Sequence, residues 1–150
     1  MKNVFQQEDV KEIIARIEQL TPNSQRLWGT MDVAQMLAHC NVTYELVYDN
    51  KHPKANFLKR FILKLFVKNI VVSEKPYKKN NPTAPEFVIA DERDFELEKK
   101  RLIDYINKTQ ALGTAFFEGK ESNSFGNLTA NEWNNTFYKH LDHHLQQFDV

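Results

Sequence analysis

The sequence has few of the residues that cross-link a small fold or form tight turns: cysteine, glycine and proline are all scarce. Cys40 is the single cysteine, which excludes an internal disulfide and favours a reducing compartment. Four glycines and five prolines in 150 residues favour helices over a many-stranded sheet. No apolar run reaches transmembrane length, and the first ten residues lack an apolar signal core. We therefore expect a soluble, cytoplasmic protein, with one domain over residues 1–150 and no integral membrane segment.

Net charge is also absent, because twenty basic residues balance twenty acidic ones. The charges are uneven, however, with nine Lys or Arg and a single acid, Glu74, between Lys51 and Lys79. Such a segment can attract phosphate, nucleic acid or anionic lipid. The simpler interpretation is a solvated helix surface that faces acidic neighbours. The neutral total and the lack of a recognised DNA- or RNA-binding motif argue against nucleic acid as a partner.

Apolar residues that recur at helical spacing predict four main helices. The first covers Val10 to Leu20 and is stopped by TPNS at 21–24. The second starts from an N-cap at Thr30 and is apolar over much of its circumference, which is typical of a buried central helix. A charged helix opens at Asp91, and the segment 113–127 after it is predicted to be a loop. The last helix starts at a T-x-x-E capping box, Thr129 with Glu132, and runs to the end of the sequence.

A shorter amphipathic helix is predicted in FLKRFILKLFVK, residues 57–68. Its lysines lie largely outside an apolar face that comprises Phe57, Leu58, Phe61, Ile62, Leu65 and Phe66. This helix could lie on a membrane surface, but a helix that covers the core explains the pattern without a further assumption. Residues 69–90 hold three of the five prolines and predict a long irregular connection. The fold class is therefore all-α, a four-helix bundle with one short extra helix and long crossover loops.

Three of the five histidines lie close together in the last helix, in FYKHLDHHLQQF (137–148). At roughly 100° per residue, His140 and His144 fall inside the apolar stripe of that helix, and His143 lies toward its edge. Residues at i and i+4 stand one turn apart, close enough to share a metal ion. Two imidazoles buried without an ion would need several hydrogen-bond partners. A chance pair and an i, i+3 pairing of His140 with His143 remain alternatives, but the stripe favours His140 with His144.

A third ligand has to come from another helix. His52 adjoins Pro53 in an expected loop, whereas His39 lies in the middle of the expected central helix. His39 can also be an ordinary core histidine, but the pair in the last helix makes it the best candidate. Three histidines leave a position for water or substrate, as catalytic sites do. The all-nitrogen set suits a divalent metal, with Zn²⁺ or Ni²⁺ favoured and Fe²⁺ or Co²⁺ as alternatives. Cys40 is turned about 100° from His39, so we expect a buried structural thiol.

One histidine in the second helix, a spacer of roughly a hundred residues and H-x-x-x-H in the last helix is a pattern similar to that of the DinB/YfiT-like superfamily. WGTMDVAQMLAHC, DFELEKKRLIDYI and FGNLTANEWNNTFYKHLDHHLQQF resemble an uncharacterised domain family placed within it. The resemblance covers nearly the whole chain. It implies a DinB-like bundle of up-down-down-up type in which His39, His140 and His144 hold a divalent metal. The stripe geometry places His143 at the rim of such a site, where it would contact either a substrate or solvent.

The same resemblance implies an activity. Characterised relatives include transferases that use low-molecular-weight thiols such as bacillithiol, a mycothiol-dependent isomerase and proposed metal-dependent hydrolases, and many are homodimers. The first hypothesis is thus a metal-dependent enzyme that acts on a small-molecule substrate by thiol transfer or hydrolysis. No acid is clearly placed as a general base, which favours thiol transfer. The alternative is a non-catalytic bundle that binds a metal, a ligand or a partner.

Overall fold

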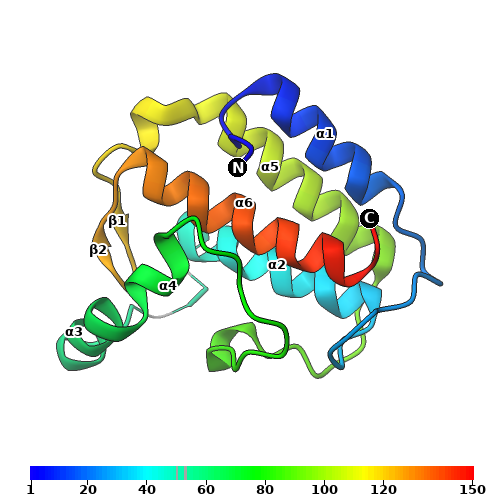
Figure 1. Cartoon of the computed structure of the whole chain (residues 1–150), viewed down its shortest axis with the longest axis horizontal. Helices are drawn as coiled ribbons and strands as arrows, with labels where there is room; N and C mark the ends of the chain where they lie inside the picture. Colours follow the sequence, from blue (N-terminus) through cyan, green and yellow to red (C-terminus); the bar gives the residue numbers. More distant parts are fainter. Residues whose placement is uncertain (50, 53) are drawn as a thin grey trace.

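The computed structural model describes residues 1–49, 51–52 and 54–150, and its chain is mostly helical. Asn50 and Pro53, in the predicted interruption after the second helix, lie outside the described residues. The four long helices lie side by side (Figure 1): α1 (Gln7–Glu18), α2 (Val33–Tyr48), α5 (Phe95–Phe117) and α6 (Ala130–Gln147). The connection from α2 to α5 carries α3 (Phe57–Phe66), α4 (Lys68–Val72) and the 3₁₀ helix η1 (Pro85–Phe87). The helical class is confirmed, but two short α-helices accompany the long ones where one was predicted.

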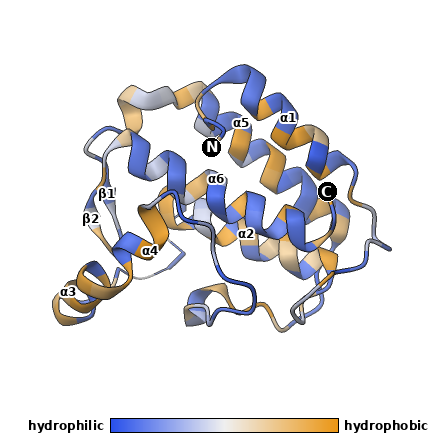
Figure 2. Ribbon diagram, in the orientation of Figure 1, coloured by the Kyte–Doolittle hydropathy of each residue, from blue (hydrophilic) through white to orange (hydrophobic). Residues whose placement is uncertain are grey.

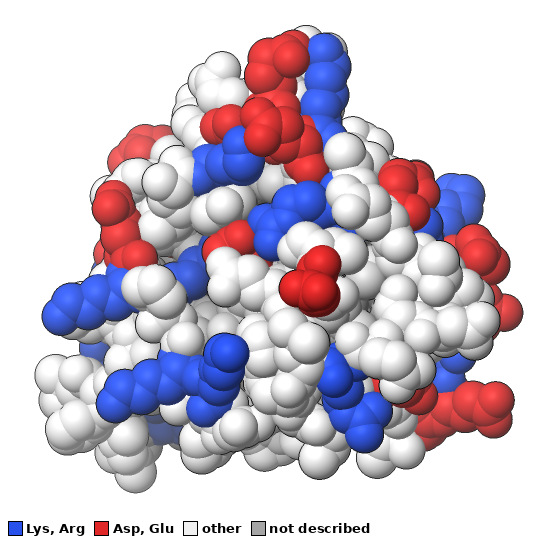
Figure 3. Space-filling model, turned by 45° about the vertical axis from the view of Figure 1, so that its right-hand side comes forward, with Lys and Arg blue, Asp and Glu red and all other residues white. Residues whose placement is uncertain are grey.

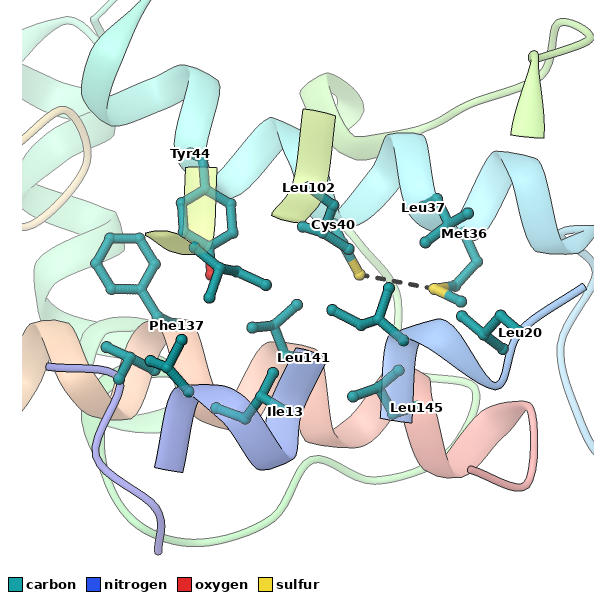
Figure 4. Close-up of a cluster of buried hydrophobic side chains, with 14 of the residues drawn as sticks. Ile13, Leu20, Met36, Leu37, Cys40, Tyr44, Leu102, Phe137, Leu141 and Leu145 are labelled. Carbon is teal, nitrogen blue, oxygen red and sulfur yellow. Dashed lines mark hydrogen bonds between the residues drawn. The ribbon is translucent and has the colours of Figure 1, made fainter. Parts of the chain in front are cut away.

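The four long helices share one hydrophobic core, drawn in Figure 4. Ile13 of α1, Leu37 of α2, Leu102 of α5 and Leu141 of α6 are each at most 2% exposed. Burying a side chain of this size contributes roughly 1.5–3 kcal/mol. Twelve of the sixteen residues of α2 are buried, which confirms the prediction of a central helix. Every face of α2 therefore meets protein, including the face that carries His39.

Side-chain caps fix where the long helices begin. At α6, Thr129 accepts from the backbone N–H of Glu132 and the Glu132 side chain accepts in return, so the predicted capping box is confirmed. The prediction of Thr30 as the cap of α2 is wrong, because Asp32 forms that capping box with Gln35. The prediction that a helix opens at Asp91 is also wrong. The cap of α5 is Asp94, whose carboxylate accepts from the N–H of Leu97.

The segment predicted as a loop over 113–127 is largely ordered into regular structure. Gly113 has φ 68° and bends α5, which then continues to Phe117. Glycine adopts this positive-φ conformation without the steric cost of a Cβ atom, so Gly113 interrupts the regular helix and separates two helical segments at a kink. A short antiparallel hairpin follows, in which β1 (Glu121–Ser122) pairs with β2 (Gly126–Asn127). The predicted irregular connection over 69–90 does contain the end of α4 and η1.

The short amphipathic helix α3 does not cover the core, and that prediction is wrong. Figure 2 shows α3 as a strongly hydrophobic element beyond the ends of the long helices. No residue of α3 is buried. The periodicity predicted its helical state and its apolar face correctly. Among the residues that the structure describes, none covers this face, and its side chains stay exposed.

The basic stretch from Lys51 to Lys79 is largely neutralised within the chain. Lys51 pairs with Glu45 at 3.3 Å, and the other pairs are Lys54–Glu121, Lys59–Glu86, Arg60–Glu121 and Lys68–Glu132. The interpretation of these cations as facing acidic neighbours is confirmed for these five. Figure 3 shows basic and acidic side chains interspersed on one face of the molecule. Within the described residues, no helix combines the length and the apolar character needed to cross a membrane.

Candidate metal centre

The structure brings the three predicted histidines together from two helices. His39 comes from the middle of α2, and His140 and His144 come from successive turns of α6. Phe137 and Leu141 on the same stripe of α6 are buried against the core, and this packing turns both histidines toward α2. His39 and His144 are buried, while His140 keeps a partly exposed edge. The i, i+4 spacing thus places His140 and His144 on one face of α6, and His39 of α2 completes the group of three.

The ligand nitrogens of these three residues converge. One ring nitrogen from each lies within 4.8 Å of the others. The Nε2 atoms of His39 and His140 are 2.9 Å apart. The ring centroids are separated by 4.5 to 4.9 Å, with the rings inclined to one another rather than stacked. Three imidazole nitrogens that face one point form a donor set of the kind that holds a single divalent ion.

The outward-facing nitrogen of each ring is held by an oxygen atom. Nδ1 of His39 lies 2.8 Å from the backbone oxygen of Phe87, and Nδ1 of His140 lies 2.9 Å from Oγ1 of Thr43. Nδ1 of His144 lies 2.8 Å from Oε1 of Gln147. Because a carbonyl oxygen only accepts, the Nδ1 of His39 carries the proton and its Nε2 presents a lone pair inward. Such partners fix the tautomer and the ring orientation of metal-binding histidines.

Gln147 holds His144 because its own amide is oriented by the chain. Its Nε2 donates to the backbone oxygen of Trp28 at 2.7 Å, which leaves Oε1 to accept from His144. Gly29 makes this approach feasible. Its φ is +80°, and a Cβ atom there would lie 2.5 Å from Nε2 of Gln147. The Trp28–Gly29 turn therefore belongs to the support of the site, although it lies far from α6 in the sequence.

Burial keeps the three imidazoles neutral at physiological pH. It lowers the pKa of His39, lowers the pKa of His140 well below its usual range and lowers the pKa of His144 to about 3. Their mutual repulsion as cations acts in the same direction for His140 and His144. A neutral imidazole is the form that binds a metal, so the ion competes with few protons at pH 7.

The hydrogen bonds around the cluster fit a divalent ion. His39 and His144 both direct unprotonated Nε2 atoms inward, because their Nδ1 protons are donated to carbonyl oxygens. If His140 likewise donates to Thr43, lone pairs of His39 and His140 face each other at 2.9 Å, and a cation removes that repulsion. If Thr43 donates instead, His140 can donate to His39 without an ion. The Thr43 hydroxyl thus accommodates both states.

The cluster opens onto a large cavity. This cavity has a volume of about 1020 Å³, and its wall includes all three histidines. Most of its remaining wall is apolar or aromatic, including Trp28, Leu63, Val67, Phe87, Phe125 and Leu128. A cavity of this size can hold a small organic molecule. A molecule in it would lie beside the converging nitrogens.

His143 is the histidine that the sequence places toward the edge of the apolar stripe of α6. It lines the cavity but is not part of the three-histidine group. Its ring packs edge-on against Tyr77 and Trp28, each with centroids 5.8 Å away. Burial also lowers the pKa of His143. The alternative pairing of His140 with His143 is therefore not the arrangement that the fold produces.

The other candidates are engaged elsewhere. Cys40 is buried, its thiol donates to Sδ of Met36 at 3.8 Å, and burial raises its pKa, as expected of a structural thiol. His52 hydrogen-bonds Glu45 at 2.9 Å, and Glu45 also pairs with Arg101. Glu45 of α2, Arg101 of α5 and His52, which follows α2, therefore form a polar network apart from the three-histidine group.

Sequence reasoning missed the supporting residues of the site. Gln147 had a usable signal, because it follows its partner His144 by three residues and lies one turn along α6. Thr43 had a weaker one, because it follows His39 by four residues and so shares the face of α2 that meets its partner His140. The carbonyl of Phe87 had none, since a backbone oxygen carries no residue identity. It reaches His39 only because η1 packs beside α2.

The chain belongs to the family described as Protein of unknown function (DUF1569), which matches residues 2–150. No curated protein and no solved structure matches it.

Proposed function

We propose that this protein is a divalent-metal-dependent enzyme with a DinB/YfiT-like four-helix bundle. His39, His140 and His144 hold the ion, and a small-molecule substrate binds in the adjoining cavity. One observation carries the proposal: three neutral imidazoles from two helices converge while each outer nitrogen is held by an oxygen. Buried histidines of any role need such partners, so the feature specific to a metal site is that one ring nitrogen from each residue also converges within 4.8 Å of the others.

The fold supports the same assignment. The DinB/YfiT-like pattern requires one histidine on the second long helix and a pair one turn apart on the last, and α2 and α6 carry them. The long connection from α2 to α5 then builds the cavity wall through α3, α4 and η1. The bundle supplies a rigid base for the ligands, and the connection supplies the surface that selects a substrate.

A divalent ion held by three histidines supplies Lewis-acid chemistry, lowering the pKa of a water or thiol that occupies its open position. The protein's own residues then position the second reactant. His143 and Trp28 stand at the rim, and Phe87 lines the wall beside His39. The apolar lining limits access of water and accommodates an apolar part of the substrate.

Of the two reactions, the surroundings favour thiol transfer. Within the part of the chain that the structure describes, the group of converging metal-type ligands contains histidines and no carboxylate. Glu86 is the carboxylate among the cavity-lining residues, and it is paired with Lys59. Glu45 is held by Arg101 and His52, and Glu132 by Lys68 and its capping role. Hydrolysis usually needs a general base beside the water, whereas a thiol activated by the ion needs none. A low-molecular-weight thiol is therefore the proposed co-substrate.

The test is a turnover assay on protein loaded with Zn²⁺ or Ni²⁺. Low-molecular-weight thiols are offered with apolar electrophiles, and esters and amides are assayed in parallel. We expect thiol consumption by wild type and His52→Ala and none by His140→Ala. His143→Ala should keep its metal and raise KM more than it lowers kcat. Full metal occupancy with no turnover of any substrate would make the protein a non-catalytic metal-binding bundle.

A further inference from the structure

The apolar face of α3 is an exposed surface that the candidate metal centre does not use. Phe57 is 87% exposed and Phe66 is 71% exposed, and the other residues of the face are Leu58, Phe61, Ile62 and Leu65. A hydrophobic side chain of aromatic size presents about 150–250 Å² when exposed, so these six expose on the order of 800 Å² together. A monomer rarely leaves a contiguous apolar patch above a few hundred Å². This face therefore calls for a partner.

The charges around the face argue against an anionic partner. Lys59 is paired with Glu86 at 3.2 Å, and Arg60 is paired with Glu121 at 2.5 Å. Among the residues that the structure describes, Lys64 is the cation of α3 that forms no ion pair. Binding to anionic lipid relies on clusters of about four to eight free Lys or Arg. An acidic protein would likewise find one cation, so an apolar and nearly neutral surface fits better.

The order of residues in α3 makes its face complementary to itself. The apolar positions are symmetric about the middle of the helix, between residues 61 and 62. In an antiparallel pair, Phe57 would lie opposite Phe66, Leu58 opposite Leu65, and Phe61 opposite Ile62. An interface between two identical chains related by a twofold axis needs this self-complementarity. The exposed area also matches the roughly 800 Å² per partner of a standard interface.

We infer that the apolar face of α3 joins two copies of this chain, with the two α3 helices antiparallel across a twofold axis near residues 61 and 62. The opposite side of α3 borders the candidate substrate cavity through Lys59 and Leu63. Association therefore steadies one wall of the cavity in each copy. The dimer does not depend on a bound metal, because the three histidines lie on α2 and α6.

The mass of the full chain in solution, measured by light scattering after size exclusion, tests this inference. Wild type and His140→Ala should both have twice the mass of the chain, and the double variant Phe61→Glu with Leu65→Glu should have the mass of one chain. Leu97→Glu is the matched control, since Leu97 on α5 is 56% exposed but outside the face, and it should stay dimeric. None of these side chains is buried, so circular dichroism should show unchanged folding.

A cross-link tests the antiparallel arrangement. Ile62→Cys should form a covalent dimer with a short bismaleimide, whereas Leu97→Cys should not, and the native Cys40 is buried and does not compete. A wild type of single-chain mass would overturn the inference, and so would binding of α3 to lipid vesicles by a monomer. A dimer that survives the double variant, or one that Ile62→Cys does not cross-link, would place the interface elsewhere.

Discussion

Helices α6 and α3 are both amphipathic, but the apolar face of α6 is buried and that of α3 is exposed. The segregation of apolar from polar residues is sharper in α3 than in α6. Yet α6 buries Trp133, Phe137 and Leu141, while α3 buries nothing. Periodicity therefore specifies which face of a helix is apolar. Whether that face becomes core, an interface between chains or open surface depends on the elements that the rest of the chain brings against it.

The buried face of α6 also carries polar groups, and the structure satisfies them. Asn135 donates to the backbone oxygen of Val72, and Nζ of Lys139 donates to the oxygen of Ile70. Burial lowers the pKa of Lys139 to about 8. These bonds fasten the end of α4 to α6. The three histidines belong to the same class of buried polar groups, but their inner nitrogens face one another, which leaves a place for an ion.

The largest contrast between the two helices should appear in stability. Phe137 is fully buried and packs against Tyr44 and Trp133. Phe137→Ala should lower the free energy of unfolding by about 3–5 kcal/mol, because it opens a cavity in the core. Phe61→Ala on α3 should lower the free energy of unfolding of a single chain by less than about 0.5 kcal/mol, because Phe61 is 54% exposed and lies outside the core. Urea unfolding measures both, and equal losses would mean that α3 is packed onto the core.

Acid should destabilise the metal-free protein through α6. Because burial depresses the pKa values of His140 and His144 below the ordinary 6.5, the unfolded chain binds more protons than the folded one below that pH. Stability should therefore fall as pH drops from 6.5, and His144, with a folded-state pKa of about 3, should account for a loss of about 2 kcal/mol at pH 4.5.

Urea unfolding of chelator-treated protein across this range measures the effect. His144→Ala should reduce the loss of unfolding free energy below pH 6.5 by the contribution of one histidine, whatever the stability of the variant at pH 7. A slope that is the same in both proteins would show that His144 titrates alike in the folded and unfolded chain.

The smallest contrast concerns the N-caps of the two helices. Thr129 caps α6 and Asn56 caps α3, each by accepting a backbone N–H. Thr129→Ala should lower global stability by about 1 kcal/mol. Asn56→Ala should leave global stability unchanged and speed amide hydrogen exchange within α3 alone, because α3 can unfold locally. Hydrogen exchange would contradict this if the core amides of α2 also lost protection.

Much of the fold was readable from the sequence where a local rule decides it. The T-x-x-E signal placed the start of α6 correctly, and the all-round apolar pattern of α2 identified the buried helix. The starts of α2 and α5 were missed by two and three residues because several acids and threonines compete as caps, and Asp32 and Asp94 are the ones with a free N–H in reach. The exposure of α3 could not be predicted from the sequence, because no local pattern shows which element packs against the apolar face of a helix.

In the candidate site, too, some residues could be predicted from the sequence and others could not. The i, i+4 spacing put His140 and His144 on one face, and the buried helix pointed to His39. The carbonyl of Phe87 and the Trp28–Gly29 turn could not be predicted, because they come from loops that tertiary packing brings to the site. Their contribution is orientation of the rings, which depends on distances rather than residue types.

The most direct test of the three-histidine site is the metal content of protein purified without a histidine tag. We expect about one divalent ion per chain in wild type, as for a mononuclear site. The ion should be lost in His39→Ala, His140→Ala and His144→Ala and kept in His52→Ala and His143→Ala, whose histidines lie outside the group. No ion in the wild type after dialysis against Zn²⁺ and Ni²⁺, or equal loss in all five variants, would contradict the site.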